Sequence, residues 1–241
     1  LFRLPDAHAV INRMGFNNKG IDYLLDQVRQ SCYQGVLGIN IGKNFDTPVE
    51  NAVADYLIGL QKAYAHAHYI TVNISSPNTP GLRKLQYGDD LKRLLVTLRE
   101  EQAKLAQQHG RYVPVAIKVA PDLTEQEIRD MAAVFSTVKI DGLIATNTTL
   151  DRSAVEGMPH ADEQGGLSGM PLTHRSTEVI RQFRADMDSQ IPIIGVGGII
   201  SGEAAKAKLE AGASLVQVYT GFLYRGPALI KECIEATHKA G

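Results

Sequence analysis

The sequence predicts an α/β fold, and within that class it favours a (β/α)8 barrel, the TIM-barrel architecture. Three observations support this prediction: short, nearly continuous apolar runs recur along the chain, amphipathic helical stretches separate them, and polar side chains follow the runs. Continuous apolar runs are typical of parallel strands that are covered on both faces. The predicted strands span residues 35–41, 69–74, 113–119, 142–146, 193–196 and 215–219.

The helices between these strands carry recognisable start signals. Residues 47–50 and 124–127 each resemble a capping box, and the first also has a proline at the opening helical position. We expect Ser201 to cap a helix that ends at Gly212, Pro227 to open the last helix, and residues 21–28 to form an early one. The apolar stripes of these helices comprise Val53, Tyr56, Leu57, Leu60, Leu91, Leu94, Leu95, Leu98, Leu105, Ile128, Met131, Ala132, Phe135, Leu229, Ile230, Cys233 and Ile234.

The polar positions decide between a doubly wound sheet and a closed barrel. A barrel gathers the carboxyl ends of all its strands around one mouth, whereas an open sheet uses mainly its switch point. The polar or glycine positions at strand ends are Asn40, Asn73, Lys118, Asn147, Gly197, Gly198 and Thr220. We count six βα units in one domain, 1–241, so two further strands are expected upstream of Leu1. Residues 2–18 are expected to be irregular or to form a hairpin.

Composition limits the possible functions. The formal net charge of −1 gives no broad basic surface, so no nucleic-acid partner is expected. No apolar run approaches the roughly 20 residues that span a bilayer. Cys32 and Cys233 lie far apart in sequence, which fits a reducing compartment, and we expect both thiols to be buried and inert. The histidines show no metal-ligand spacing, so no metal is predicted.

Glycine-rich stretches at the ends of the last two strands predict a phosphate site. Residues 194–199 contain the pair Gly197 and Gly198, and residues 218–221 end the next strand. Backbone N–H groups of two such loops form the usual phosphate site of a barrel. Residues 165–169 form a further glycine-rich loop that can fold over the same ligand. The alternative is that these glycines serve only tight turns.

Uncharged amides and one lysine suggest a planar ligand at the same mouth. Asn73 and Asn78 supply hydrogen-bond donors and acceptors suited to an amide or imide ring, although turn formation is an equal alternative. Asn12, Asn40 and Asn147 add further amides. Lys118 can face an anionic ligand or extend to the rim.

Charged bases are scarce at these strand ends. This leaves Ser76 as an unusual candidate proton acceptor.

These stretches together resemble the dihydroorotate dehydrogenase family. The similar segments keep the family's order and cover the chain: 12–17, 38–44, 73–81, the Lys118 strand, 145–149, 165–169 and 195–198. The family's soluble class uses a cysteine base, and its membrane-associated, quinone-reducing class uses a serine. Residues 73–83 resemble the serine loop, with Ser76 in the base position, so the quinone-linked class is implied.

The resemblance implies roles for individual residues. Ser76 and Lys118 are the implied catalytic residues: Ser76 takes a proton from C5 of dihydroorotate while hydride passes from C6 to N5 of FMN, and Lys118 stabilises the reduced flavin. Residues 78–86 are implied to form a lid. The implied FMN contacts are Asn40, Asn73, Lys118, Thr146, Gly169, Gly198, Tyr219 and Thr220. The implied contacts with dihydroorotate or orotate are Asn12, Arg13, Met14, Gly15, Phe16, Asn73, Asn78, Asn147 and Thr148.

Parts of the family pattern do not occur in these 241 residues. They include the first two barrel strands, with a flavin loop and a substrate-binding lysine, and an N-terminal helical segment that contacts quinone and membrane. The resemblance implies a peripheral protein on the cytoplasmic face of the cell (inner) membrane. We expect this stretch alone neither to close its barrel nor to reduce quinone.

Three alternatives remain. A flavin-free isomerase or lyase would share the glycine loops but would not explain the asparagines and Ser76. A non-catalytic binding module would fit the missing segments. A soluble-class dehydrogenase that uses fumarate or NAD is disfavoured by serine at position 76.

Overall fold

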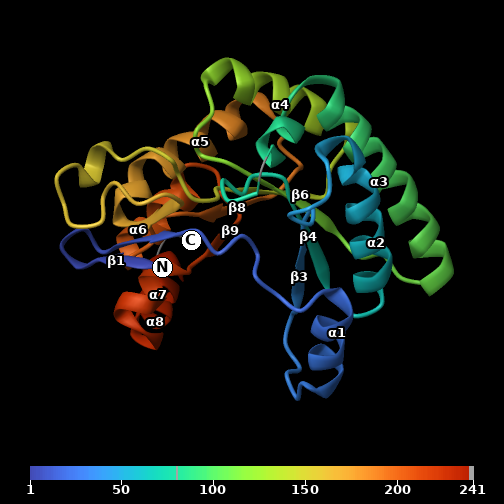
Figure 1. The fold of residues 1–241 in the computed structure, drawn as a ribbon, viewed down its shortest axis with the longest axis horizontal. Coiled ribbons are helices and arrows are strands. Elements are labelled where there is room, and N and C mark those ends of the chain that lie inside the picture. Colours follow the sequence, from blue (N-terminus) through green and yellow to red (C-terminus); the bar gives the residue numbers. More distant parts are fainter. Residues whose placement is uncertain (80, 239–241) are drawn as a thin grey trace.

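The protein is described by a computed structural model covering residues 1–79 and 81–238. Its centre is a parallel sheet of six strands in the order β3-β4-β5-β6-β8-β9. The sheet curls, and helices α2 to α6 form an arc around its convex side (Figure 1). This confirms the predicted barrel-type α/β architecture with six βα units. The strands are β3 Gly38–Ile41, β4 Tyr69–Asn73, β5 Val115–Val119, β6 Gly142–Ala145, β8 Ile193–Val196 and β9 Leu215–Gln217.

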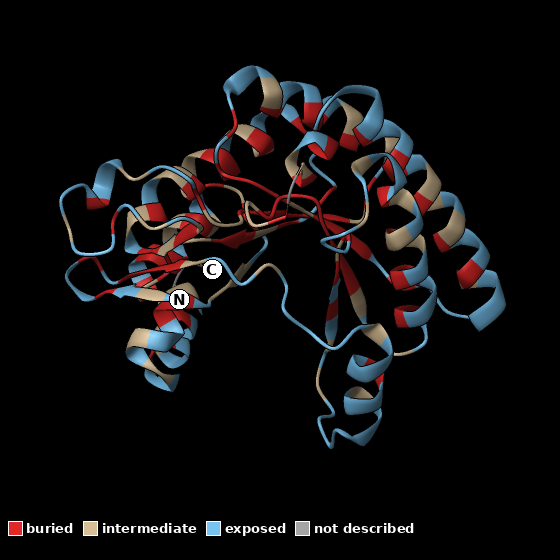
Figure 2. Cartoon of the chain, viewed as in Figure 1, coloured by how far each residue is buried: buried red, intermediate tan, exposed pale blue. Residues whose placement is uncertain are grey.

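The helices bury one face against the sheet and expose the other (Figure 2). Leu91, Leu94 and Leu98 are buried on α3, and Ile128 and Phe135 are buried on α4, as their spacing predicted. Packing of these side chains against the strands forms one continuous core. The α-helices are α1 Ile21–Gln30, α2 Ala52–Tyr64, α3 Gly88–His109, α4 Glu125–Val138, α5 Thr173–Asp186, α6 Gly202–Glu210, α7 Thr220–Arg225 and α8 Pro227–His238. No helix in the described ranges is long and apolar enough to cross a bilayer.

A second, antiparallel sheet lies beside the barrel sheet. It contains β1 Phe2–Leu4, β2 Ala9–Asn12 and β7 Gly166–Gly169, in the order β1-β2-β7. The hairpin expected within residues 2–18 is therefore present. The prediction of a loop at 165–169 was wrong, because this segment pairs with β2 as a strand. Glycine permits that approach: a Cβ on Gly169 would lie 2.2 Å from the carbonyl oxygen of His8.

The local start signals were partly confirmed. Thr124 and Glu127 form the predicted capping box, and the Ser201 side chain accepts from the Ala204 N–H at 3.1 Å. No side chain caps the helical segment that begins near Val49, so the capping box predicted at 47–50 was wrong. The chain opens there with a 3-10 turn, and the Lys43 ammonium donates to the Thr47 carbonyl at 2.5 Å.

Several other predictions need correction. Cys32 is exposed because it lies in the segment after α1, outside the core, whereas Cys233 is buried as expected. The helix expected to reach Gly212 ends at Glu210. Two residues of the last apolar stripe, Ile230 and Ile234, are exposed.

Candidate functional site

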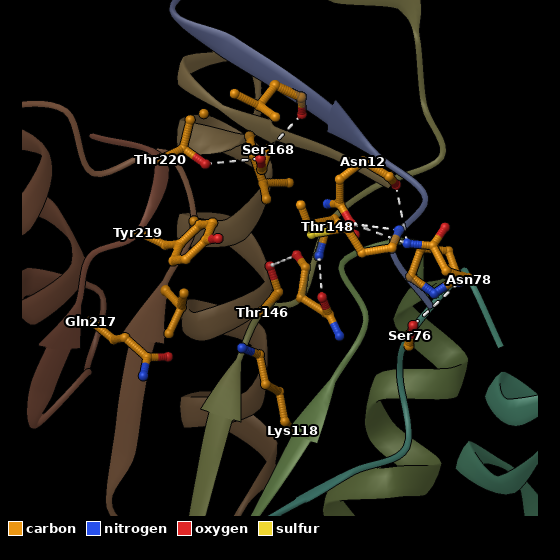
Figure 3. Close-up of a pocket in the computed structure, with 18 of the residues that line it drawn as sticks. Asn12, Ser76, Asn78, Lys118, Thr146, Thr148, Ser168, Gln217, Tyr219 and Thr220 are labelled. Carbon is orange, nitrogen blue, oxygen red and sulfur yellow. Dashed lines mark hydrogen bonds between the residues drawn. The ribbon is translucent and has the colours of Figure 1, made fainter. Parts of the chain in front are cut away.

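A cavity of about 400 Å³ lies at the carboxyl ends of the parallel strands. This volume is within the range of small-molecule sites. Ser76 and Asn78 lie on one side of the cavity and Tyr219 and Thr220 on the other, with Lys118 between them in the view of Figure 3. Because parallel strands end at one edge, residues far apart in sequence meet here.

Asn73 and Asn147 share a hydrogen-bond network at the floor of the cavity. The Asn147 amide donates to Asn73 Oδ1 at 3.3 Å and to Ser75 Oγ at 3.1 Å. Asn73 Oδ1 also accepts from the Ser75 N–H at 3.0 Å. The hydroxyl of buried Tyr56 donates to the Asn73 carbonyl at 2.6 Å and fixes the end of β4 from the helix side. Both amides are thus held in defined orientations before any ligand arrives.

Ser76 follows this network and is buried, with 6% of its surface exposed. Its oxygen accepts from the Asn78 backbone N–H at 3.3 Å, which leaves the hydroxyl hydrogen free to point elsewhere. The Asn78 side chain donates to the Asn12 carbonyl at 3.1 Å and to Asn12 Oδ1 at 3.3 Å. This contact joins the Ser76 loop to β2, and the dashed lines in Figure 3 follow it.

Arg83 ties the Ser76 loop to two neighbouring strand ends. Its guanidinium donates to the Ser75 carbonyl at 3.1 Å, to the Thr148 carbonyl at 3.0 Å and to Asp122 at 2.8 Å. Arg83 lies in the 3-10 turn Leu82–Gln86, within the segment expected to act as a lid. Position 80 of that segment lies outside the described residues.

Lys118 ends near the centre of the cavity, on β5. Its ammonium has no hydrogen-bond or ion-pair partner among the described residues, and burial lowers the pKa of its side chain. A partly buried cation without a protein partner is costly unless a ligand supplies the opposite charge. Lys118 is therefore the site's clearest indication of an anionic or electron-rich ligand.

Glycines shape the opposite end of the cavity. Gly198 has φ +68°, and a Cβ there would lie 2.3 Å from the Thr173 nitrogen, so only glycine fits. Nearby, Thr220 Oγ1 donates to Ser168 Oγ at 2.8 Å, and Ser168 donates to the Val10 carbonyl at 3.1 Å. These contacts join α7, β7 and β2 around a polar end of the cavity suited to a phosphate group.

The structure brings nearly all of the predicted site residues to this cavity. Arg13 is the exception: it does not line the cavity but forms an ion pair with Glu163 at 2.7 Å on the outer side. Those that line it are Asn12, Met14, Gly15, Phe16, Asn40, Asn73, Ser76, Asn78, Lys118, Thr146, Asn147, Thr148, Gly169, Gly198, Tyr219 and Thr220.

Sequence reasoning missed three polar lining residues, Asn17, Ser168 and Gln217. Asn17 ends the recognised stretch 12–17, Ser168 lies within the recognised glycine-rich stretch, and Gln217 is a polar residue inside the predicted strand 215–219. Each of the three therefore carried a signal. In the ranges that the structure describes, no cluster of three or more histidine, cysteine or acidic residues is placed to hold a metal ion.

Comparison with known proteins identifies the family. The sequence profile of dihydroorotate dehydrogenase matches residues 1–239, almost the whole chain. The chain belongs to the dihydroorotate dehydrogenase family. Among similar relatives named dihydroorotate dehydrogenase (quinone), one from Ectopseudomonas mendocina is 59% identical over 236 residues, covering 98% of this chain and 69% of the relative. One from Aeromonas salmonicida is 61% identical over 234 residues, covering 97% of this chain and 70% of the relative.

Solved dihydroorotate dehydrogenases also share the fold. The structure of the Eimeria tenella enzyme in complex with ferulenol superimposes with a TM-score of 0.91 at 36% identity, covering 100% of this chain and 70% of that chain. A ligand-free structure from the same organism superimposes with a TM-score of 0.90 at 38% identity. The match covers 100% of this chain and 73% of the ligand-free one. The cavity therefore belongs to an established dihydroorotate dehydrogenase fold, and the serine-class resemblance agrees with the quinone-dependent names of the relatives.

Proposed function

We propose that this protein oxidises (S)-dihydroorotate to orotate in de novo pyrimidine (UMP) biosynthesis, as an FMN-dependent dihydroorotate dehydrogenase of the quinone-linked class. One observation carries the proposal: Ser76, Lys118 and the asparagine amides converge on a single cavity. The residues 1–241 act as a single FMN-binding barrel domain.

The chemistry of the cavity fits FMN. Lys118 offers an unpaired cation where a flavin ring that becomes anionic on reduction would need one. Gly198 allows backbone approach at the polar end, where the Thr220 and Ser168 hydroxyls lie 2.8 Å apart. The residues proposed to hold FMN are Asn40, Asn73, Lys118, Thr146, Gly169, Gly198, Tyr219 and Thr220. FMN supplies the hydride acceptor.

The substrate end is proposed to be lined by amides. Dihydroorotate is a cyclic imide with alternating N–H and C=O groups, which match amide donors and acceptors. The residues proposed to bind it are Asn12, Arg13, Met14, Gly15, Phe16, Asn73, Asn78, Asn147 and Thr148. Arg13 takes this role by exchanging its pairing with Glu163 for the substrate's carboxylate.

Ser76 is proposed to remove the proton from C5 while the C6 hydride leaves, so that the C5–C6 double bond of orotate forms. A serine hydroxyl is a weak base, so its negative charge must be stabilised as the proton moves. The Asn78 N–H that already donates to Ser76 Oγ supplies one such interaction. The low exposure of Ser76 keeps bulk water from competing for the proton.

We further propose that a membrane quinone takes up the electrons, with the protein lying peripherally on the cytoplasmic face of the cell (inner) membrane. The names of the relatives support the quinone. The serine at position 76 argues against the soluble class, and the amide cluster argues against a flavin-free isomerase or lyase.

The decisive experiment replaces Ser76. Ser76→Ala should slow the bleaching of bound flavin by dihydroorotate in anaerobic stopped-flow by at least about 100-fold, because general-base catalysis contributes about that much. The FMN content of the purified protein should stay unchanged. Ser189→Ala, in the exposed segment before β8, is the matched control and should behave as wild type. Bleaching at the wild-type rate in Ser76→Ala would remove Ser76 from the mechanism.

A further inference from the structure

Lys208 on α6 is a fully buried lysine that the proposed chemistry does not use. Its side chain is 0% exposed, and no carboxylate of the described chain pairs with it. Its Nζ donates to the Thr173 carbonyl at 2.7 Å, Ser176 Oγ at 2.7 Å and Thr177 Oγ1 at 2.5 Å. Burying an ammonium this way is costly, and a methionine would fill similar volume without that cost. Packing alone therefore does not account for a lysine here.

The residues that Lys208 holds contact the glycine pair after β8. The Thr173 hydroxyl lies within donating distance of the Gly198 carbonyl at 2.7 Å and of the Met170 carbonyl at 2.8 Å. Ser176 accepts from Lys208, so its own hydrogen is directed to the carbonyls within its reach. These are the carbonyls of Leu172 at 2.8 Å, Gly197 at 2.9 Å and Thr173 at 3.3 Å. The first turn of α5 thus binds both glycine carbonyls, and Lys208 fixes that turn from behind.

The direction of these carbonyls sets the direction of two N–H groups. In a trans peptide the C=O and the N–H point opposite ways. With the Gly197 and Gly198 carbonyls directed at α5, the N–H groups of Gly198 and Ile199 face away from it. Both of these residues line the cavity. In the described ranges the Gly198 N–H has no hydrogen-bond partner, so it is available to a ligand.

We infer that Lys208 is a positioning residue for the phosphate end of the site, acting through Thr173 and Ser176 to aim the Gly198 and Ile199 N–H groups at the ligand's phosphate. The inference rests on the proposed FMN site and deepens it. Lys208 itself does not line the cavity. Its effect is therefore specific to ligands that carry a phosphate.

Riboflavin lacks the phosphate and separates this role from general packing. Binding of FMN and of riboflavin to the full-length apoprotein is measured by quenching of flavin fluorescence. Lys208→Met should weaken FMN binding by about tenfold or more, the scale of a few hydrogen bonds, and leave riboflavin binding unchanged. Circular dichroism checks that the variant is folded.

Two further variants serve if Lys208→Met fails to fold. Ser176→Ala breaks the link to the Gly197 carbonyl and should also weaken FMN selectively. Thr177→Val removes an ammonium partner that has no contact with the glycine loop, and it should bind FMN nearly as wild type does.

Equal weakening of FMN and riboflavin, or unchanged FMN affinity in both Lys208→Met and Ser176→Ala, would overturn the inference. A wild-type apoprotein that binds neither flavin would instead overturn the proposed function, and the inference with it.

Discussion

Replacing Arg83 with methionine tests whether the loop that carries Ser76 is held in place from outside the cavity. The substitution keeps the aliphatic stem and removes three donors, to the Ser75 carbonyl, the Thr148 carbonyl and Asp122. Ser75 is fully buried, so its carbonyl loses a partner that water cannot readily replace.

The expected magnitude follows from these contacts. Hydrogen bonds to a charged group contribute about 1.5–3 kcal/mol each, but they are not additive. The Arg83 and Asp122 side chains are 20% and 26% exposed, and solvent screening lowers their pair energy. We take about 2 kcal/mol for the three Arg83 contacts together. If losing them raises the activation free energy by this amount through misplacement of Ser76, the reaction slows about 30-fold.

The assay is the anaerobic reduction of bound flavin by dihydroorotate. Arg83→Met should lower the limiting rate about 30-fold and change FMN affinity much less. Arg93→Met is the matched control, because Arg93 forms only an exposed pair with Asp90 on α3. A limiting rate equal to that of wild type would refute the idea that Arg83 positions the base.

Two lysines give the remaining predictions. Lys118→Met should lower the midpoint potential of the bound flavin by about 40 mV, the equivalent of about 2 kcal/mol for two electrons, because the reduced ring loses its cation. Redox titration measures this shift, exposed Lys62→Met is the control, and an unchanged potential would contradict the assigned role. Burial lowers the pKa of Lys208 to about 7, whereas an unfolded lysine titrates near 10.4. Between these two pH values the Lys208 side chain is protonated in the unfolded chain and largely neutral in the folded one, so the unfolded state binds more protons. The unfolding free energy of wild type relative to Lys208→Met should therefore rise with pH by about 1.4 kcal/mol per unit, and it should be flat below about pH 7. Denaturant titrations across this range measure the difference, and one that stays flat or falls with pH would be inconsistent with this pKa.

The sequence predicted the parallel sheet well because its signal is local. Each strand is a short apolar run, and β8 Ile193–Val196 matches its predicted bounds. Where a strand begins can depend instead on its pairing partner. β3 begins at Gly38 because Gly38 pairs with Tyr69, the first residue of β4, and residues 35–41 alone do not show this. The strand-end polar residues were predictable for the same reason, since parallel strands collect their ends at one edge.

The features that the sequence did not predict depend on contacts between residues far apart in the chain. β2 and β7 are short, and Val10 pairs with Ser168 across most of the chain, so neither segment shows a strand pattern by itself. Arg13 lies beside predicted site residues, but its ion pair with Glu163 turns it outward. Lys208 has the sequence setting of a surface helix residue, and only the packing of α5 on α6 reveals its burial.

The pairing of β2 with β7 has a consequence for the order of folding. Ser168 donates to the Val10 carbonyl, and the Tyr224 hydroxyl donates to the Ala9 carbonyl at 2.8 Å, so β2 is anchored by segments that follow it by more than 150 residues. Closing such long loops costs entropy that only the finished contacts repay, which places this step late. During synthesis the β1–β2 hairpin gains these contacts only after Ser168 and Tyr224 have been made. A ligand that binds only after β2 has paired with β7 would then stabilise the fully folded chain relative to forms in which this pairing is absent.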